Sequence, residues 1–212
     1  MLILYAQLGA CSHAALYDFL VSLPMHLQQQ IIAYKAGPEQ QLRIVSKMLL
    51  LKAVQHYYPE HKGDIWAHYA KDANAKPVLA MPSLHFSTAH SAQLCVLSAD
   101  IGNQNGIDVE LIRPIPPTLY EDYLCEKEKN RLKNTPGKNV SFVETWTRKE
   151  AVLKAAGLGI HYPIRQINTA ENTVTLKGKT YHLQNMDIHP LYKCTLAARK
   201  ATAPTIRAIS IV

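Results

Sequence analysis

The sequence predicts an α+β fold, because helical and strand periodicities both occur within its 212 residues. Apolar side chains recur at helical spacing over 38–57 and again over about 140–156. Residues 106–111 instead alternate apolar and polar side chains, which is typical of a strand with one buried face. Short strand-like stretches separated by turn residues between 164 and 199 predict an antiparallel β region near the C-terminus.

The N-terminal part of the chain shows one strand pattern and one clear helix pattern. Residues 2–6 form an apolar run that predicts a buried strand. Helical spacing over 13–33 is interrupted by Pro24, whereas the helix of 38–57 is clear and starts with Pro38, a residue suited to a first helical position. The apolar stripe of that helix predicts that it packs on the core.

The remaining elements follow from shorter patterns. Residues 93–99 predict a buried strand, and the turn residues of 102–106 predict that it forms a hairpin with 106–111. Residues 118–133 predict a helix whose charged run at 126–129 lies on a solvated face. The C-terminal strands are expected at 164–169, 173–176, 180–183 and 193–199.

Two carboxylates share one face of the strand at 106–111. Asp108 and Glu110 alternate with Ile107, Val109 and Leu111, which form the buried face. Two residues of rise separate the carboxylates by roughly 6.5 to 7 Å, so both can converge on one small cation. Oxygen ligands of this kind suit Mg²⁺, which often binds substrate phosphates as well. Phosphate chemistry is therefore expected.

The helix over about 140–156 offers a third carboxylate, Glu150. Ser141 and Thr147 each begin a capping box, and only the box that begins at Thr147 uses Glu150 as a structural cap. Because the apolar period already begins at Phe142, we favour Ser141 as the cap. Glu150 then lies inside the helix and is free for chemistry, with Lys154 one turn later on the same face.

Four stretches together resemble the signature of the Sfp-type 4'-phosphopantetheinyl transferase family. They are Lys76–Pro77, Phe86–Ser91, Gly106–Glu110 and Trp146–Gly159, and their order and spacing match the family pattern. The helix that begins near Arg43 is similar to the family's coenzyme-binding helix.

The chain departs from that pattern at two positions. Ala75 replaces the glycine that usually precedes Lys76, and Ala89 replaces the hydroxyl residue that usually precedes His90. His85 is a weaker alternative to His90 as the histidine of the site.

The resemblance implies two similar α/β halves in a pseudo-twofold arrangement, with the cofactor cleft between them. Residues 1–103 would form the N-terminal half, which carries the coenzyme A phosphate-binding residues. Residues 104–212 would form the C-terminal half, which carries the metal site and the catalytic helix. The implied reaction moves 4'-phosphopantetheine from coenzyme A to a serine of an apo acyl, polyketide or peptidyl carrier protein and releases adenosine 3',5'-bisphosphate.

The resemblance also assigns roles to individual residues. Mg²⁺, or Mn²⁺, would bind Asp108, Glu110 and Glu150. Glu150 would take the serine proton, either directly or through a metal-bound water, and Lys154 would stabilise the leaving bisphosphate. The coenzyme phosphates would be held by Arg43, Lys76 and His90.

The net charge of +7 at pH 7 agrees with several kinds of partner. Nucleic-acid-binding proteins usually cluster their Lys and Arg residues, whereas here they are spread along the chain, so we expect no nucleic acid partner. An anionic small molecule or an acidic protein explains the charge equally well. Coenzyme A and an acidic carrier protein are one such pair.

Composition further predicts a cytoplasmic protein. The cysteines are scattered without C-x-x-C pairs, which favours free thiols in a reducing compartment. There is no basic N-terminal region of a signal peptide, and no apolar run approaches the roughly 18 residues that a membrane span requires. With 48% apolar residues, the chain can form one large core or two cores of about a hundred residues each. Its length is similar to that of the monomeric class of the family, so a monomer is expected.

Two alternatives remain. Asp108 and Glu110 can be the solvated face of an edge strand, with Glu150 and Lys154 as a surface pair. The chain can also be a non-catalytic basic module that binds nucleic acid or an acidic protein on a decayed transferase scaffold, for which Ala89 is the only support. Metal-dependent turnover with coenzyme A separates these alternatives from the transferase.

Overall fold

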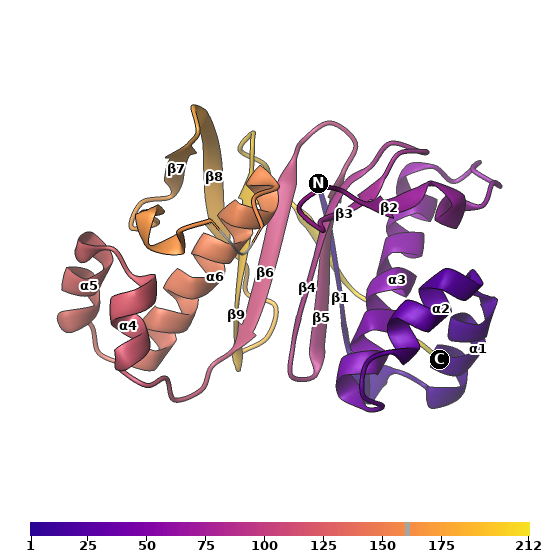
Figure 1. The fold of residues 1–212 in the computed structure, drawn as a ribbon, viewed down its shortest axis with the longest axis horizontal. Coiled ribbons are helices and arrows are strands. Elements are labelled where there is room, and N and C mark those ends of the chain that lie inside the picture. Colours follow the sequence, from indigo (N-terminus) through magenta and orange to yellow (C-terminus); the bar gives the residue numbers. More distant parts are fainter. Residues whose placement is uncertain (160–161) are drawn as a thin grey trace.

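A computed structural model of the protein describes residues 1–159 and 162–212. Two four-stranded sheets lie next to each other in the middle of the molecule, and a long helix packs on each (Figure 1). The fold is therefore α+β, as predicted. The helices are α1 (His13–Ser22), α2 (Met25–Ile32), α3 (Pro38–Tyr57), α4 (Thr118–Tyr123), α5 (Glu126–Lys133) and α6 (Lys138–Ala156).

The strands fall into three sheets. The first has the order β10-β1-β5-β4 and the second the order β6-β9-β8-β7, while β2 and β3 form a separate pair. Their bounds are β1 (Leu2–Gln7), β2 (Tyr69–Lys71), β3 (Pro77–Leu79), β4 (His85–Ser91), β5 (Leu94–Asp100), β6 (Asn105–Leu111), β7 (Thr173–Leu176), β8 (Lys179–Asn185), β9 (Tyr192–Ala198) and β10 (Thr205–Ala208).

Both halves of the chain follow the same plan. In the first, β1 leads through helices to α3 and then to β4 and β5, and β5 lies between β1 and β4. In the second, β6 leads through helices to α6 and then to β8 and β9, and β9 lies between β6 and β8. The prediction of two similar α/β halves is confirmed.

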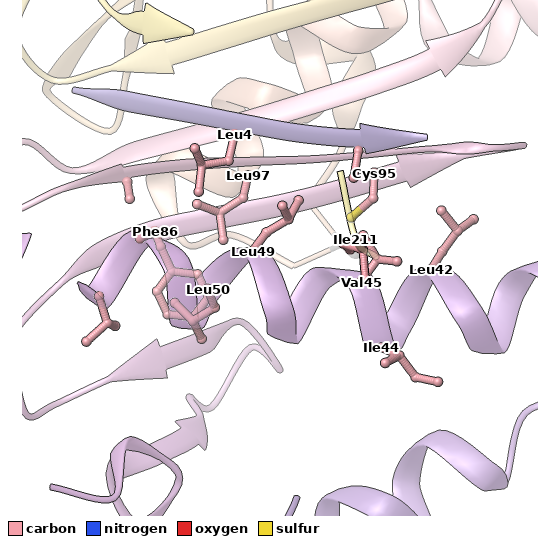
Figure 2. Packing of buried hydrophobic residues seen from close by; sticks show 14 of the residues in the cluster. Leu4, Leu42, Ile44, Val45, Leu49, Leu50, Phe86, Cys95, Leu97 and Ile211 are labelled. Atoms are coloured by element: carbon pink, nitrogen blue, oxygen red, sulfur yellow. The ribbon is translucent and has the colours of Figure 1, made fainter. Parts of the chain in front are cut away.

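The core of the first half lies between α3 and its sheet (Figure 2). Leu42, Val45 and Leu49 project from one face of α3 toward the strands, where they meet Leu4 and Leu97. All five side chains are almost fully buried. The apolar stripe predicted for this helix is thus the face that covers the sheet.

The second half has a much closer contact between helix and strand. A Cβ added to Gly106 of β6 would lie 2.3 Å from the carbonyl oxygen of Ala151 and 2.3 Å from the backbone nitrogen of Ala155, both in α6. No side chain fits in this space, so glycine allows the two backbones to touch. The contact brings Asp108, two residues further along β6, against α6.

The two sheets meet at the edge strands β4 and β6. The hydroxyl of Ser87 accepts a hydrogen bond from the N–H of Ile107 at 3.1 Å, and that of Ser91 accepts one from the N–H of Leu111 at 3.1 Å. Because both pairs are offset by the same number of residues, the strands run in the same direction. Serine hydroxyls thus satisfy donors of an edge that main-chain pairing leaves open.

The last strand crosses back to the first half. Strand β10 pairs in parallel with β1, with Leu2 opposite Thr205, and Ile211 forms a bridge with Cys11. A division at 103/104 follows the repeated plan, but the chain beyond about residue 204 hydrogen-bonds to the first sheet.

The predicted hairpin between 93–99 and 106–111 is wrong. Strand β5 pairs with β1 and β4, whereas β6 pairs with β9 in the other sheet. Asn105 holds the connection: its side chain accepts from the hydroxyl of Ser98 at 2.6 Å and donates to the carbonyl of His85 at 3.0 Å. These bonds replace strand pairing where the chain leaves the first sheet.

Three further predictions are wrong around α6. The helix begins at Lys138 with Gly137 as its cap, so Ser141 lies inside the first turn. The predicted helix of 118–133 is two helices, and only the first half of its charged run is solvated, because Glu126 and Lys127 are exposed whereas Glu128 and Lys129 are buried.

A buried ion pair accounts for the burial of Glu128 and for the turn that replaces the strand predicted at 164–169. Lys149 of α6 lies 2.8 Å from the carboxylate of Glu128 and also donates to the carbonyls of Ile164 and Ile167. The carbonyl of Ile164 begins a 3₁₀ turn at Ile164–Gln166, and that of Ile167 directly follows this turn, in a region where a strand was predicted. A buried ammonium requires such partners, and they shape the turn around it.

Two properties predicted from composition can be compared with the described residues. None of the helices in residues 1–159 and 162–212 is long and apolar enough to cross a membrane. Cys11, Cys95, Cys125 and Cys194 are free thiols.

Candidate active site

Strand β6 and helix α6 bring Asp108 and Lys154 into direct contact. The ammonium of Lys154 lies 2.7 Å from Oδ1 of Asp108. Asp108 is only 5% exposed, and its Oδ2 is buried without a hydrogen-bond partner. Burial raises the pKa of Asp108 to about 7, Lys154 opposes this rise, and the charges of Glu110 and Glu150 add to it.

Glu150 lies one turn before Lys154 on α6, as the helical spacing predicted. Burial raises the pKa of its carboxyl, Lys154 opposes the rise, and Glu110 adds to it. Neighbouring carboxyls with raised pKa values are a feature of catalytic sites, where burial and like charges adjust acid and base strength.

Glu110 completes the group of three carboxylates. It is half-buried, and its Oε2 accepts a hydrogen bond of 2.7 Å from the hydroxyl of Ser91. Its charge acts on both Asp108 and Glu150, so the three groups form one electrostatic cluster.

The donor atoms of this cluster are of the type that binds a divalent cation, but their side chains are not arranged around one point. Over residues 1–159 and 162–212, no three His, Cys, Asp or Glu side chains are gathered closely enough to hold an ion. The ammonium of Lys154 neutralises Asp108 instead. Oxygen-only donors and the unpartnered Oδ2 of Asp108 fit Mg²⁺, and Asp108, Glu110 and Glu150 are the residues that would hold it.

Two adjoining cavities form a cleft beside the carboxylates. One, of about 500 Å³, lies between the halves and is lined by loop 73–77, β4 and the end of α6. The other, of about 440 Å³, lies within the first half against α3. Both are lined by Ala75, Pro77, Phe86 and Thr88, and their size suits a cofactor.

The smaller cavity contains Arg43 and His90. The guanidinium of Arg43 stacks on the ring of Tyr34, with 3.5 Å from Cζ to the ring centroid, and donates to Glu39 at 2.7 Å. Its Nε is buried without a partner. Burial lowers the pKa of His90, Glu39 opposes this change, and Arg43 and Lys154 reinforce it. An anion in this cavity would find unused donors.

Sequence reasoning missed two lysines that also line this cavity, Lys47 and Lys71. Burial lowers the pKa of Lys47 to about 8, and the charges of Lys71 and Arg43 lower it further. Among the described residues, no carboxylate forms an ion pair with either lysine. Lys47 follows Arg43 by one helical turn, and this spacing was the available signal.

Lys76 has a different position from the other predicted phosphate ligands. Its ammonium donates to the carbonyl of Lys154 at 2.6 Å, and the side chain of Asn74 donates to the carbonyl of Gly157 at 2.7 Å. Loop 72–76 therefore caps the C-terminus of α6 across the cleft. Ala75 adopts φ +61° in this loop, which is the conformation that the family's usual glycine would favour.

The sequence between 104 and 202 matches the family model described as the 4'-phosphopantetheinyl transferase superfamily. Over these residues the chain is similar to this superfamily. The matched stretch contains Asp108, Glu110, Glu150 and Lys154, and therefore the whole carboxylate cluster.

Several transferases with this name are similar in sequence. The 4'-phosphopantetheinyl transferase psf-1 of Bacillus pumilus is 28% identical over 145 residues, covering 64% of this chain and 62% of that protein. HetI of Nostoc sp. is 29% identical over 155 residues (58% and 65%), and gsp of Aneurinibacillus migulanus 32% identical over 137 residues (60% and 56%). The chain thus spans less than two thirds of the length of the curated relatives it matches. The Thermotoga maritima holo-[acyl-carrier-protein] synthase structure has a TM-score of 0.36 at 20% identity, covering 45% of this chain and 61% of that one.

Ala89, at the position where the sequence departs from the family pattern, is buried between the sheets. It packs with Ile3, Val96, Ile107 and Val109 in one apolar cluster. The methyl group therefore contributes to the junction between the halves, where a hydroxyl would require a partner.

Proposed function

We propose that this chain transfers 4'-phosphopantetheine from coenzyme A to a serine of an apo acyl, polyketide or peptidyl carrier protein, with Mg²⁺, and releases adenosine 3',5'-bisphosphate. One observation supports this most directly: a single cleft has the Asp108, Glu150 and Lys154 cluster at one end and the basic side chains of the smaller cavity at the other. The phosphates of coenzyme A would offset the charge of the cation end, and a divalent cation would offset the charge of the carboxylate end.

The carboxylate end would carry the chemistry. Glu150 accepts the proton of the carrier serine as its oxygen forms a bond to the pantetheine phosphorus, and its raised pKa makes it a stronger base. Lys154 lies beside Asp108 and stabilises the bisphosphate oxygen that leaves with the bond electrons. Asp108, Glu110 and Glu150 would hold Mg²⁺, which neutralises charge on the pyrophosphate oxygens when bound.

The cation end would hold the coenzyme. Arg43 and His90 offer donors to its phosphates, and Lys47 and Lys71 add charge that no carboxylate of the described chain balances by an ion pair. Burial lowers the pKa of Lys47, and repulsion from Lys71 and Arg43 lowers it further; an anion bound there would offset this repulsion. This grip would fix the pyrophosphate near Glu150.

The decisive experiment is a carrier-modification assay. The protein is incubated with coenzyme A, Mg²⁺ and a panel of apo carrier proteins, and each carrier is weighed by mass spectrometry. We expect a phosphopantetheine mass gain on at least one carrier, none on the same carrier with its acceptor serine changed to alanine, and loss of the gain in EDTA. No gain on any carrier, with salt-sensitive retention on DNA, would favour a non-catalytic basic module. Full activity in EDTA would contradict the metal role.

We further propose a cellular location and an oligomeric state for the protein. Four free thiols agree with a cytoplasmic protein in a reducing compartment. We also propose that the protein is a monomer, as the length of the chain led us to expect.

A further inference from the structure

Ser91, the last residue of β4, is hydrogen-bonded to a carboxylate of the cluster. Its hydroxyl donates to Oε2 of Glu110 at 2.7 Å and accepts from the backbone N–H of Leu111 at 3.1 Å. A serine hydroxyl has one proton, and the bond from Leu111 occupies its acceptor side. The proton is therefore directed at Glu110.

The surroundings of Ser91 hold this hydroxyl in place. Ser91 pairs with Leu94 at the closed end of the β4–β5 hairpin. Ala92 turns the chain there with φ +51°, and the N–H of Gln93 donates to the hydroxyl of Tyr192 in β9 at 3.3 Å. Residues of both halves thus fix the end of the hairpin beside Glu110.

Ser87 provides a comparison within the same strand. It lies four residues earlier on the same face of β4, and its hydroxyl also accepts a backbone N–H of β6, that of Ile107, at 3.1 Å. Among the described residues, the hydroxyl of Ser87 has no hydrogen bond to a carboxylate. The two serines share the role of joining the sheets, and only Ser91 also contacts Glu110.

We propose that Ser91 is a positioning residue that holds the Glu110 carboxylate for the divalent cation, engaging Oε2 and leaving Oε1 for the ion. The inference rests on the proposed function, because it assumes that Glu110 is a metal ligand. Partners that orient a metal-binding side chain typically change metal affinity by about 10- to 100-fold when removed. Ser91 is not among the residues that line the smaller cavity.

The test measures Mn²⁺ binding to the protein in the presence of coenzyme A, by the electron paramagnetic resonance signal of free Mn²⁺. We expect Ser91→Ala to weaken Mn²⁺ binding about tenfold, Ser91→Thr to restore it, and Ser91→Cys, with its weaker donor, to lie between them. Ser87→Ala is the matched control: it also leaves a β6 N–H without its serine partner, and Mn²⁺ binding should stay within about twofold of the parent. Melting temperatures of all variants establish that each is folded.

The outcomes separate this inference from the proposed function. Unchanged Mn²⁺ binding in Ser91→Ala, or an equal loss in Ser87→Ala, would overturn the positioning role while carrier modification by the parent protein stands. A parent protein that binds no Mn²⁺ would overturn the inference together with the metal site. A selective loss in Ser91→Ala that Ser91→Thr reverses supports it.

Discussion

The helices α3 and α6 occupy equivalent places in the two halves, and each presents two charged residues one turn apart to the same cleft. On α3 these are Arg43 and Lys47, which have like charges. On α6 they are Glu150 and Lys154, which have opposite charges, and Lys154 also contacts Asp108. The repeated fold thus places similar positions around the cleft, and the side chains give each end its own charge.

This difference indicates what the cleft lacks without a ligand. At one end, burial and neighbouring cations lower the pKa of Lys47 to about 8, and at the other, burial raises the pKa of Asp108 to about 7. A lowered lysine pKa and a raised aspartate pKa both mean that the charged form of the side chain is destabilised, so each cluster reduces the stability of the free protein. An anion at the cation end and a cation at the carboxylate end relieve both.

The largest effect is expected at the α6 end, from Glu150→Gln. The substitution keeps the size and helix propensity of the side chain while removing its charge and the base. Turnover in the carrier assay should fall by about 10³-fold, with the melting temperature nearly unchanged.

Lys154→Ala and the double variant test whether the α6 pair acts as a unit. Lys154→Ala should lower turnover and leave Mg²⁺ affinity near that of the parent protein, and its loss should combine with that of Glu150→Gln less than additively. Near-parental turnover in Glu150→Gln with intact metal binding would contradict the acid-base role.

The second prediction concerns packing, which also differs between the halves. Gly106→Ala puts a Cβ 2.3 Å from two backbone atoms of α6, so β6 and α6 must separate. We expect a loss of about 3 kcal/mol or more in the free energy of unfolding, measured by urea denaturation. Gly102→Ala is the control, because nothing lies within 4 Å of its added Cβ. Equal, small losses in both would contradict the close contact.

Local patterns predicted the parts of the site that lie within single elements. Alternation in β6 put Asp108 and Glu110 on one face, and helical spacing in α6 put Glu150 beside Lys154, because both periodicities are properties of the local backbone. The partners that cross between elements were not predicted: Ser91 for Glu110, Lys149 for Glu128, and β10 for β1. These depend on long-range packing that one sequence does not encode at a recognisable spacing.

The third prediction concerns how the cation end binds phosphate. Arg43→Ala should weaken coenzyme A binding by about 1 to 3 kcal/mol, since a hydrogen bond to a charged group is lost. If Arg43 holds the 3'-phosphate, calorimetry should show a smaller loss for dephospho-coenzyme A.

His90→Ala is expected to have the same effect on binding of the two coenzymes as Arg43→Ala. For Lys76 there are two hypotheses, a phosphate ligand or a cap of α6. If Lys76 is a 3'-phosphate ligand, Lys76→Ala should weaken binding of coenzyme A more than that of dephospho-coenzyme A. Its bond to the Lys154 carbonyl predicts instead equal losses for both ligands and a lower melting temperature for Lys76→Ala. If Lys76→Ala weakens binding of coenzyme A more than that of dephospho-coenzyme A and does not lower the melting temperature, Lys76 leaves the Lys154 carbonyl to bind the 3'-phosphate.

The smallest effect, and the one specific to the α3 end, is a gain of stability in Lys47→Met. The pKa of Lys47 is about 8 in the folded protein and 10.5 at its ordinary value, so between these values the unfolded chain binds more protons. The parent protein therefore gains stability as the pH rises through this window, and the charged lysine costs stability below it.

Methionine retains most of the apolar length of the lysine side chain and carries no charge. Lys47→Met should therefore exceed the parent in unfolding free energy by about 1 to 2 kcal/mol at pH 7, with the advantage shrinking toward zero near pH 10. The same variant should bind coenzyme A more weakly at pH 7, because the coenzyme phosphates no longer interact with the Lys47 ammonium. Urea denaturation at pH 7 and pH 10 and calorimetry at pH 7 measure both effects. A variant that is less stable than the parent at pH 7 would mean that Lys47 is balanced within the protein, and the two ends of the cleft would then not share the same need for a ligand.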